Sequence, residues 1–391
     1  MNEHNVLTKY DVGRNDDAGT RLPEDTMDTQ GNGMDGESAV ASNGPLPGAR
    51  NATASARSTA EVWPYYAEDE IAAATAVLRS GRVNQWTGDR VRVFEQKLAE
   101  YCGVKHAIAL ANGSLALELA LRTLGIGAGD EVIVTCRSFI ASASCVDLVG
   151  ARPVFADVDP LSQNISADTI APLITPRTRA IIPVHLAGWP CDMAPILALA
   201  RRHKLFVIED CAQAIGATID GKKVGSFGDA AVLSFCQDKI VTTGGEGGAL
   251  LLDDDAMWRF AWSYKDHGKD WDKSTAPASG VNYRWLHARI GTNWRMTELQ
   301  AASGIVQMSK LDGWLSQREL LAQTWREGLR PLTCFDIPLP AANIGHAWYK
   351  FYAFVKPAQL IDGIGRDEIL TLLSGHGVRA FFGSCPEIYR E

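Results

Sequence analysis

Short apolar runs alternate with helical patterns between about residue 104 and residue 255. The runs "KHAIALA", "DEVIVTC", "ARPVFADV", "TRAIIPVHLAG" and "KLFVIED" have the length and composition of strands. The patterns "SLALELALRTLG", "FIASASCVDLVG", "SADTIAPLI" and "DMAPILALARRH" separate them. Apolar strands that alternate with helices are typical of a parallel sheet covered on both faces. We therefore predict an α/β fold with a mainly parallel sheet flanked by helices.

The pattern changes towards the end of the chain. "GATIDGKKVG" predicts a hairpin, and "AAVLSFC" and "GALLLDD" predict two closely spaced strands. After residue 255 the sequence becomes aromatic and charged, and a long helical pattern covers residues 296–329. "KFYAFV" and "GVRAFF" predict strands around a helix in "GRDEILTLLSGHG". We expect a large domain over 61–255 and a small α+β C-terminal domain with dimer contacts over 256–391.

The first sixty residues have a different composition. They are rich in Asn, Asp, Gly, Ser, Thr and Ala and poor in aromatic residues. Such a segment buries too little apolar surface to offset the entropy cost of ordering, so we predict that residues 1–60 are disordered. The next stretch, "EVWPYYAEDEIAAATAVLRSG", predicts an amphipathic helix that ends at Gly81.

Charge and cysteine content exclude several classes of protein. The net charge of -8 argues against general binding to nucleic acid or to an anionic membrane. No C-x-x-C or H-E-x-x-H motif occurs, and only His185 and Cys191 approach the spacing of metal ligands, so we expect no metal site. No apolar run reaches the roughly 20 residues of a membrane span. The start lacks the apolar core of a secretory signal, which predicts a cytoplasmic protein with reduced thiols.

The common nucleotide-binding loops are also absent. "GIGAGD" begins like a dinucleotide fingerprint, but Asp130 stands where the third glycine belongs and the run precedes a strand. No G-x-x-x-x-G-K-[ST] motif occurs. The sequence therefore disfavours NAD or ATP binding through these loops.

Ligands of open α/β sheets bind beyond the carboxyl ends of the strands, so the residues that follow each strand are informative. After the first strand, Gly113 and Ser114 open a helix, and a helix N-terminus suits a phosphate. The alternative is that Ser114 only caps this helix. After the second strand come Arg137 and Phe139, an aromatic residue that is either a stacking partner for a flat ring or part of the core.

Two later strand ends carry a carboxylate and a lysine. Asp210 ends "KLFVIED", where it can pair with a protonated ring nitrogen or cap a helix. Ser234 ends "AAVLS", and Lys239 follows it between an apolar run and a glycine-rich loop. A phosphate cradle, a stacking aromatic, a carboxylate for a pyridinium and a lysine for an aldehyde are the four features that bind pyridoxal 5'-phosphate. We predict this cofactor as a Schiff base on Lys239, which then acts as general acid and base; the alternative is a surface lysine before a turn.

The run "SFCQDKIVTTGGEGGALLL" resembles the lysine signature of the DegT-type sugar aminotransferases, a branch of the fold-type I pyridoxal phosphate enzymes. The resemblance covers about residues 61–391 and includes "ANGSLALELAL", "AIIPVHLAGWPCDM", "VIEDCAQAIGA" and "GTNWRMTELQAA". It implies a fold-type I aminotransferase that uses glutamate as amino donor and a keto sugar as acceptor. Family members usually continue beyond "FFGSCPEIYRE", so we expect that, if 391 residues are the whole natural chain, a strand and a helix of the small domain are missing and that activity or solubility suffers.

The resemblance also implies a role for each matching residue. Lys239 carries the Schiff base, Asp210 pairs with the pyridine nitrogen and Gln213 lies by the phenolic oxygen of the ring. Phe139 stacks on the ring, and the phosphate is held by Gly113, Ser114 and Ser234. Asn293 matches a position that reaches the phosphate of the neighbouring subunit, which implies a homodimer with shared active sites. His185 and Arg137 are candidate substrate contacts, with a satisfied strand-end histidine as the alternative for His185.

Three hypotheses for the activity remain open from the sequence. The first is an aminotransferase acting on a nucleotide-linked 4-keto sugar or on a C8-oxidised octulosonate of lipopolysaccharide, for synthesis of a cell-surface glycan. The second is a dehydratase or lyase with the same cofactor; in the related dehydratases a histidine replaces Lys239, so the lysine favours amino transfer. The third is a regulator that binds the cofactor without catalysis.

Overall fold

A seven-stranded sheet organises the computed structural model, which describes residues 63–277 and 284–391. The strand order is β1-β9-β8-β5-β4-β2-β3. β9 pairs antiparallel with both of its neighbours, and the other pairs of the sheet are parallel. The strands are β1 (His106–Leu110), β2 (Glu131–Thr135), β3 (Arg152–Ala156), β4 (Thr178–Ile182), β5 (Phe206–Asp210), β8 (Ala230–Ser234) and β9 (Gly248–Leu252). The predicted α/β fold with a mainly parallel sheet is confirmed.

Both faces of the sheet are buried under helices, because residues along each strand alternate between two apolar clusters. In β1, Ile108 and Leu110 face one cluster with helices α3, α4 and α7, whereas Ala107 and Ala109 face another with α2 and α9. A third cluster packs α5 and α6 against β2, β4 and β5. The helices are α2 (Arg90–Cys102), α3 (Gly113–Thr123), α4 (Ala141–Leu148), α5 (Ala167–Ile170), α6 (Met193–His203) and α7 (Asp255–Lys265).

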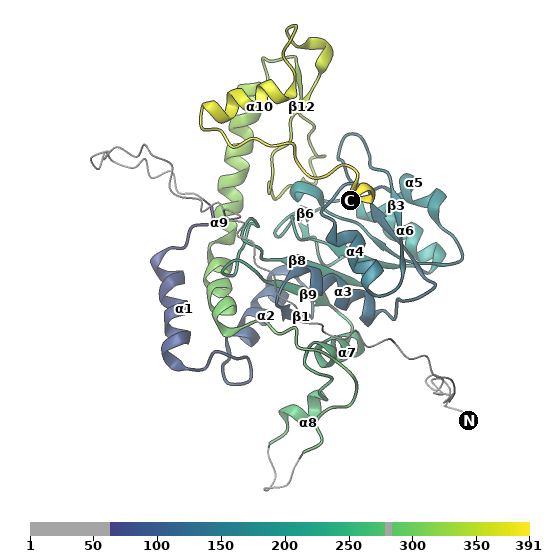
Figure 1. Ribbon diagram of the computed structural model, residues 1–391, viewed down its shortest axis with the longest axis vertical. Coiled ribbons are helices and arrows are strands. Elements are labelled where there is room, and N and C mark those ends of the chain that lie inside the picture. The colour runs from purple at the N-terminus through teal and green to yellow at the C-terminus, as the bar shows by residue number, and fades with distance from the viewer. Residues whose placement is uncertain (1–62, 278–283) are drawn as a thin grey trace, which may run out of the picture. The chain divides into compact units, whose positions relative to one another are not determined.

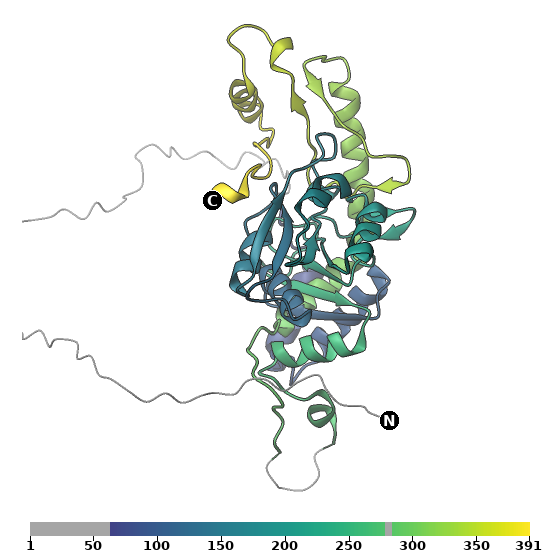
Figure 2. The ribbon, with the colours of Figure 1, turned by 90° about the vertical axis from the view of Figure 1, so that its right-hand side faces the viewer.

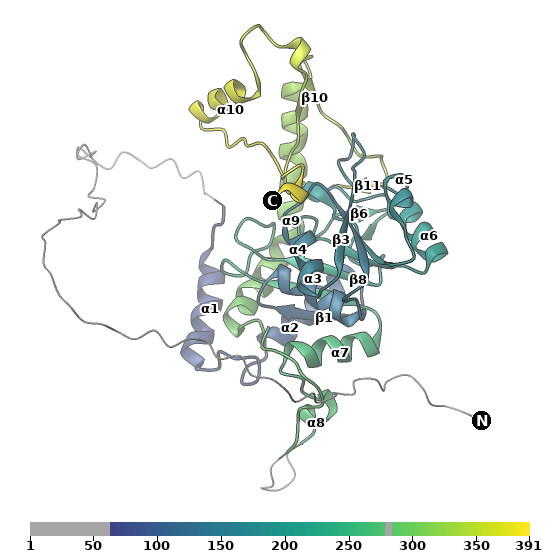
Figure 3. The same ribbon diagram turned by 45° about the vertical axis from the view of Figure 1, so that its right-hand side comes forward.

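The long helix α9 (Glu298–Leu329) connects the sheet with the C-terminal segment. Its first half packs on α2 and on α1 (Glu68–Ser80), and Figures 1 and 3 show α1 and α9 side by side. Gly81 has a φ of 68° and ends α1 in the left-handed conformation, as predicted. The predicted helix over residues 296–329 is confirmed, and Thr297 caps it by accepting a hydrogen bond from the Gln300 amide.

Beyond α9 the strands are short. β10 (Phe335–Asp336) pairs with β12 (Phe354–Val355), and β11 (Ile344–Gly345) adds to the hairpin of β6 (Thr218–Ile219) and β7 (Lys222–Lys223). The remaining helices are α8 (Trp271–Thr275) and α10 (Arg366–Gly375), and Figure 2 shows α10 separated from the C-terminal half of α9. The short 3-10 helices are η1 (Ala171–Leu173), η2 (Leu186–Gly188), η3 (Pro357–Gln359) and η4 (Ile388–Arg390).

One predicted element is wrong. "GVRAFF" forms no strand, because the amide of Val378 donates to Leu373 O at the end of α10 and Gly377 takes a left-handed φ of 77°. Phe381 and Phe382 are largely exposed. In "KFYAFV" only Phe354 and Val355 are in a strand. The helix predicted in the same region is present as α10.

The described residues pack as one compact unit. α7 lies after residue 255 yet packs on α3 and β1, so packing of the sheet continues past the expected domain boundary, which stays a prediction. The predicted disordered segment, residues 1–60, lies outside the described residues. Among the described helices, none combines the length and the apolar character needed to cross a lipid bilayer.

Candidate active site

The strand ends β1, β2, β5 and β8 lead into the residues that were predicted to bind the cofactor. Gly113 opens α3 directly after β1, and Ser234 is the last residue of β8. The two contact each other so closely that a Cβ added at Gly113 would lie 2.9 Å from Ser234 Cβ. Only glycine therefore leaves space between the first turn of α3 and the end of β8.

The N-terminus of α3 is capped by Asn112 and not by Ser114. Asn112 Oδ1 accepts a hydrogen bond from the Leu115 amide at 3.0 Å. Ser114 lies in the first turn and is exposed, so its hydroxyl is available to a ligand. The capping role considered for Ser114 is therefore wrong. The free amides of the first turn, the space at Gly113 and the neighbouring Ser234 hydroxyl fit a phosphate group.

Asp210 is buried at the end of β5. Its carboxylate accepts hydrogen bonds from Ser142 Oγ and from the Ala212 amide, each at 3.1 Å. Burial raises the pKa of Asp210, although these two bonds and the charge of Lys239 act in the opposite direction. A buried carboxylate of this kind gains stability from a cation placed beside it, as a protonated ring nitrogen would be.

Gln213 lies one turn beyond Asp210, and its side chain is buried. Its Oε1 accepts a hydrogen bond from the Ala187 amide at 2.7 Å. Ala187 has a positive φ of 59° in the turn that follows β4. Gln213 therefore fixes a strained turn at the same end of the sheet as Asp210.

Phe139 is 68% exposed at the end of β2. The alternative that it belongs to the core is therefore wrong. Arg137, two residues earlier, donates a hydrogen bond to Gln163 Oε1 at 2.6 Å and lies over the Tyr352 ring at 5.5 Å. Arg137 thus joins the end of β2 to the segment that leads to β12.

Lys239 contacts Asp238, Tyr349 and Trp63. Its side chain is 18% exposed, and Nζ lies 3.1 Å from both Asp238 Oδ1 and Tyr349 Oη. The Trp63 indole N–H donates to the Lys239 carbonyl at 3.0 Å and fixes the backbone there. The alternative of a solvent-exposed surface lysine is therefore wrong.

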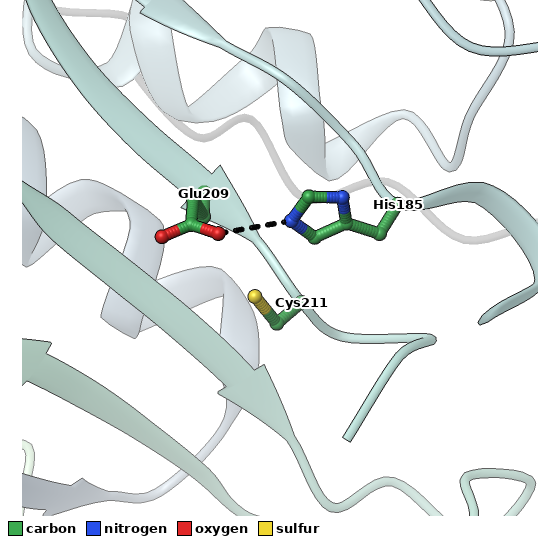
Figure 4. Close-up of side chains that lie close together, drawn as sticks. All are labelled: His185, Glu209 and Cys211. Atoms are coloured by element: carbon green, nitrogen blue, oxygen red, sulfur yellow. Dashed lines mark hydrogen bonds and ion pairs between the residues drawn. The ribbon is translucent and has the colours of Figure 1, made fainter. Parts of the chain in front are cut away.

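His185 does not face the site. It is fully buried, and Nε2 donates to Glu209 Oε2 at 3.1 Å while Nδ1 accepts from the Cys191 amide at 2.9 Å (Figure 4). Both ring nitrogens are used inside the protein, so the structure contradicts the expected substrate contact. The alternative, a satisfied histidine at the end of a strand, describes what is found.

Glu209 and Cys211 lie beside His185, and the possible ligand atoms of the three residues are all within 4.8 Å of one another (Figure 4). Glu209 also accepts hydrogen bonds from the amides of Gly225, Phe227 and Gly228. Burial alone would raise the pKa of Glu209, but the bonds from His185 and from the backbone outweigh burial and lower it. Burial raises the pKa of the Cys211 thiol, so the thiolate is disfavoured. Since both nitrogens of His185 and both carboxylate oxygens of Glu209 are engaged in hydrogen bonds, this cluster acts as a structural network.

Asn293 is exposed and forms an isolated β-bridge with Asp266. Its predicted contact with a second subunit stays a prediction.

Three residues that line the site were not predicted from the sequence. Asp238 precedes Lys239 directly, and this adjacency was the only signal for it in the sequence. Ser142 lies on α4 and Tyr349 lies 110 residues after Lys239, so neither has a local signal in the sequence.

Comparison with known proteins identifies the family of the chain. A profile of the DegT/DnrJ/EryC1/StrS aminotransferase family matches residues 64–384. The GDP-perosamine synthase of Caulobacter vibrioides is 48% identical over 289 residues, which cover 73% of this chain and 74% of that protein. The UDP-N-acetyl-3-dehydro-alpha-D-glucosamine 3-aminotransferase of Acidithiobacillus ferrooxidans is 40% identical over 291 residues, which cover 74% of this chain and 73% of that protein. The structure of an aminotransferase from Psychrobacter cryohalolentis matches with a TM-score of 0.82 at 47% identity. The match covers 84% of this chain and 86% of that chain.

These matches confirm the predicted family and the predicted enzyme class, and they confirm the fold-type I architecture. Aminotransferases of this type are pyridoxal phosphate enzymes. The chain belongs to the DegT/DnrJ/EryC1/StrS aminotransferase family.

Proposed function

We propose that this chain binds pyridoxal 5'-phosphate and moves an amino group from glutamate to a nucleotide-linked keto sugar for the synthesis of a surface glycan. The observation that carries the proposal is the convergence of Lys239, buried Asp210 and the Gly113–Ser234 contact at one end of the sheet. Each of these features fits a different part of the cofactor: Lys239 fits the aldehyde, Asp210 fits the ring nitrogen, and the Gly113–Ser234 turn fits the phosphate.

The phosphate fits the start of α3. Gly113 and Ser114 supply backbone amides, and Ser234 supplies a hydroxyl from the neighbouring strand end. The partial positive charge of the helix N-terminus favours the dianion. A side chain at position 113 would fill the space that the phosphate needs.

Asp210 and Lys239 have different chemical roles. When bound, the cofactor supplies an electron sink for the carbon next to the amino group. Asp210 holds a proton on the ring nitrogen, since an ionised carboxylate in a buried position is stabilised by a neighbouring cation. Lys239 Nζ would hold the aldehyde of the cofactor and, once released by the substrate amine, would take a proton from the substrate carbon and return it. Phe139, exposed at the same strand ends, covers one face of the ring.

The sugar class is supported by the relatives. Both curated relatives described above have names that refer to nucleotide-linked sugars, one GDP-linked and one UDP-linked. A nucleotide-linked keto sugar is therefore the preferred acceptor, and an oxidised octulosonate is the alternative. Lys239 at the position where dehydratases carry histidine favours amino transfer over dehydration.

We also propose a homodimer with Asn293 of each subunit at the cofactor phosphate of the other. Asn293 and Phe139 are exposed in the single chain, which is compatible with a second copy completing the site. The cytoplasm is the location we propose, on the evidence of the sequence alone.

An assay of both products tests the proposal. The protein is incubated with cofactor, glutamate and a panel of keto sugars that includes GDP- and UDP-linked members, and 2-oxoglutarate and the aminated sugar are measured by mass spectrometry. Stoichiometric formation of both products is expected with at least one nucleotide-linked sugar. Amination of an octulosonate alone, or loss of a hydroxyl without consumption of glutamate, would contradict the proposed substrate or the proposed reaction.

A further inference from the structure

Three side chains form a closed hydrogen-bonded group at the lysine. Lys239 Nζ lies 3.1 Å from Asp238 Oδ1 and 3.1 Å from Tyr349 Oη, and the Tyr349 hydroxyl also bonds to Asp238 Oδ2. Lys239 Nζ is 4.9 Å from the centre of the Tyr349 ring. Asp238 comes from the loop after β8, whereas Tyr349 comes from the segment between β11 and β12.

The direction of each bond follows from the chemistry of the donors. A protonated lysine has three N–H donors and no acceptor, so it donates to both oxygens. The Tyr349 hydroxyl proton is therefore directed to Asp238, and a lone pair of Tyr349 Oη faces Nζ. Burial and the bond to Asp238 both raise the pKa of Tyr349, so the hydroxyl keeps its proton. The bonds from Tyr349 and Lys239 outweigh burial and lower the pKa of Asp238, which stays ionised.

The backbone around Tyr349 is fixed independently of this group. The Ala347 amide donates to Gly188 O at 2.9 Å, and the Lys350 amide donates to Ala187 O at 3.1 Å. These are bonds to the turn that Gln213 holds. Tyr349 is thus tied to the end of the sheet on both sides of its own position, and its hydroxyl has a defined place relative to Lys239.

We infer that Asp238 and Tyr349 are positioning residues for Lys239 that aim its Nζ during proton transfer. The inference rests on the proposed function and adds two residues to it. With the cofactor bound, Nζ would take the proton from the substrate C–H bond, the electron pair of that bond would pass into the electron sink that the cofactor supplies, and Nζ would then give the same proton up again. Asp238 and Tyr349 exchange no proton in this sequence. They restrict a lysine side chain that would otherwise occupy many rotamers.

Tyr349→Phe tests the inference, with Tyr101→Phe as matched control. Tyr101 is also a partly buried tyrosine whose hydroxyl bonds to an aspartate, Asp312 at 3.0 Å, but it lies on α2 and does not contact Lys239. Each protein, loaded with pyridoxal phosphate, is mixed with glutamate and with glutamate deuterated at Cα in a stopped-flow spectrometer. The readouts are the affinity for the cofactor, the rate of the half-reaction and its isotope effect.

We expect Tyr349→Phe to bind the cofactor within a few-fold of wild type, to react roughly 10- to 100-fold more slowly and to show a larger isotope effect, because proton transfer becomes more rate-limiting. Asp238→Asn should change the same quantities in the same direction, and it serves as a second variant if Tyr349→Phe is poorly folded. Tyr101→Phe should match wild type in cofactor affinity, in the rate of the half-reaction and in its isotope effect.

A Tyr349→Phe protein with a wild-type rate and isotope effect would overturn the inference, and so would a rate loss explained entirely by weaker cofactor binding. Both results would leave the proposed function in place. A wild-type protein that binds no cofactor or ignores glutamate would overturn the proposed function, and the inference with it. The wild-type trace therefore separates the two failures.

Discussion

The first helical residue of α3, Gly113, contacts Ser234 at the end of β8 so closely that a Cβ at position 113 would be 2.9 Å from Ser234 Cβ. Real Cβ atoms essentially never come so close, and the neighbour here is the rigid start of a side chain at a strand end. The contact therefore ties the turn that we propose for the phosphate to the strand that leads to Lys239.

Gly113→Ala should weaken cofactor binding by about tenfold or more, because the added methyl group occupies the space between the α3 amides and the Ser234 hydroxyl. Titration of the cofactor-free protein with pyridoxal phosphate measures the change by absorbance. Gly313→Ala is the control, since a Cβ at Gly313 meets nothing within 4 Å. Equal affinities for the two variants would contradict the assignment of the phosphate site.

Asp210→Asn should lower the rate of the glutamate half-reaction by roughly 100-fold or more, because an amide cannot hold the ring nitrogen in its protonated form. The same change should stabilise the cofactor-free protein. The folded-state pKa of Asp210 is raised above its ordinary value of 3.8, so this carboxyl costs stability as the pH rises above 3.8, and the cost is complete above the raised pKa.

Thermal unfolding without cofactor checks this second effect. At pH 7, well above the ordinary value of 3.8, the Asn variant should be more stable by on the order of 1 kcal/mol. Below pH 3.8, where the carboxyl is neutral in both states, the difference should disappear. A variant that is less stable at pH 7 would show that Asp210 is already well paired before the cofactor binds.

The strands and the lysine were predictable from the sequence because their signals are local. Short runs dominated by apolar residues, such as "EVIVT" and "GALLL", favour buried strands. Lys239 could be predicted because a glycine-rich loop follows it in the sequence. Asp210 was visible because a carboxylate at the end of an apolar strand needs a partner.

Other features depend on distant partners and could not be predicted. Tyr349 reaches Lys239 across 110 residues, and Ser142 reaches Asp210 from a different helix. "GVRAFF" has the composition of a strand but finds no strand to pair with among the described residues, and its start closes α10 instead. His185 follows a strand as a substrate contact would, yet Glu209 and the Cys191 amide use both of its nitrogens.

Glu209→Gln should destabilise the protein by about 3 kcal/mol at pH 7, because it breaks a buried network that joins β5 to His185 and to the loop over 225–228. The folded-state pKa of Glu209 lies below its ordinary value of 4.5, so its stabilising contribution is present above pH 4.5 and decreases as the pH falls through the lowered pKa.

Thermal unfolding between pH 3 and pH 8 measures this dependence. The gap between wild type and Glu209→Gln should be constant above about pH 5 and should shrink in acid. Glu100→Gln is the control, since Glu100 is exposed on α2 and bonds only to the neighbouring Gln96 among the described residues. A gap that does not change with pH would mean that the Glu209 network is not held by an ionised carboxylate.

Two glycines of α9 should respond in opposite ways to the same substitution. Gly313→Ala should raise the unfolding free energy by about 0.5–1 kcal/mol, because the position is exposed in a helix and alanine has the higher helix propensity. Gly304→Ala should lower it by about 1–3 kcal/mol, because the new Cβ would lie 2.7 Å from the Phe94 ring. Urea denaturation compares the two. A stabilising Gly304→Ala would contradict the close packing of α9 on α2.

The absorbance spectrum of the purified protein with pyridoxal phosphate, recorded before and after excess glutamate, tests the central claim most directly. We expect a band of lysine-bound cofactor in wild type, absent in Lys239→Ala, that gives way to the band of the aminated cofactor when glutamate is added. Persistence of the first band with glutamate would contradict amino transfer from this donor. A first band of equal strength in Lys239→Ala would contradict the role of Lys239 itself.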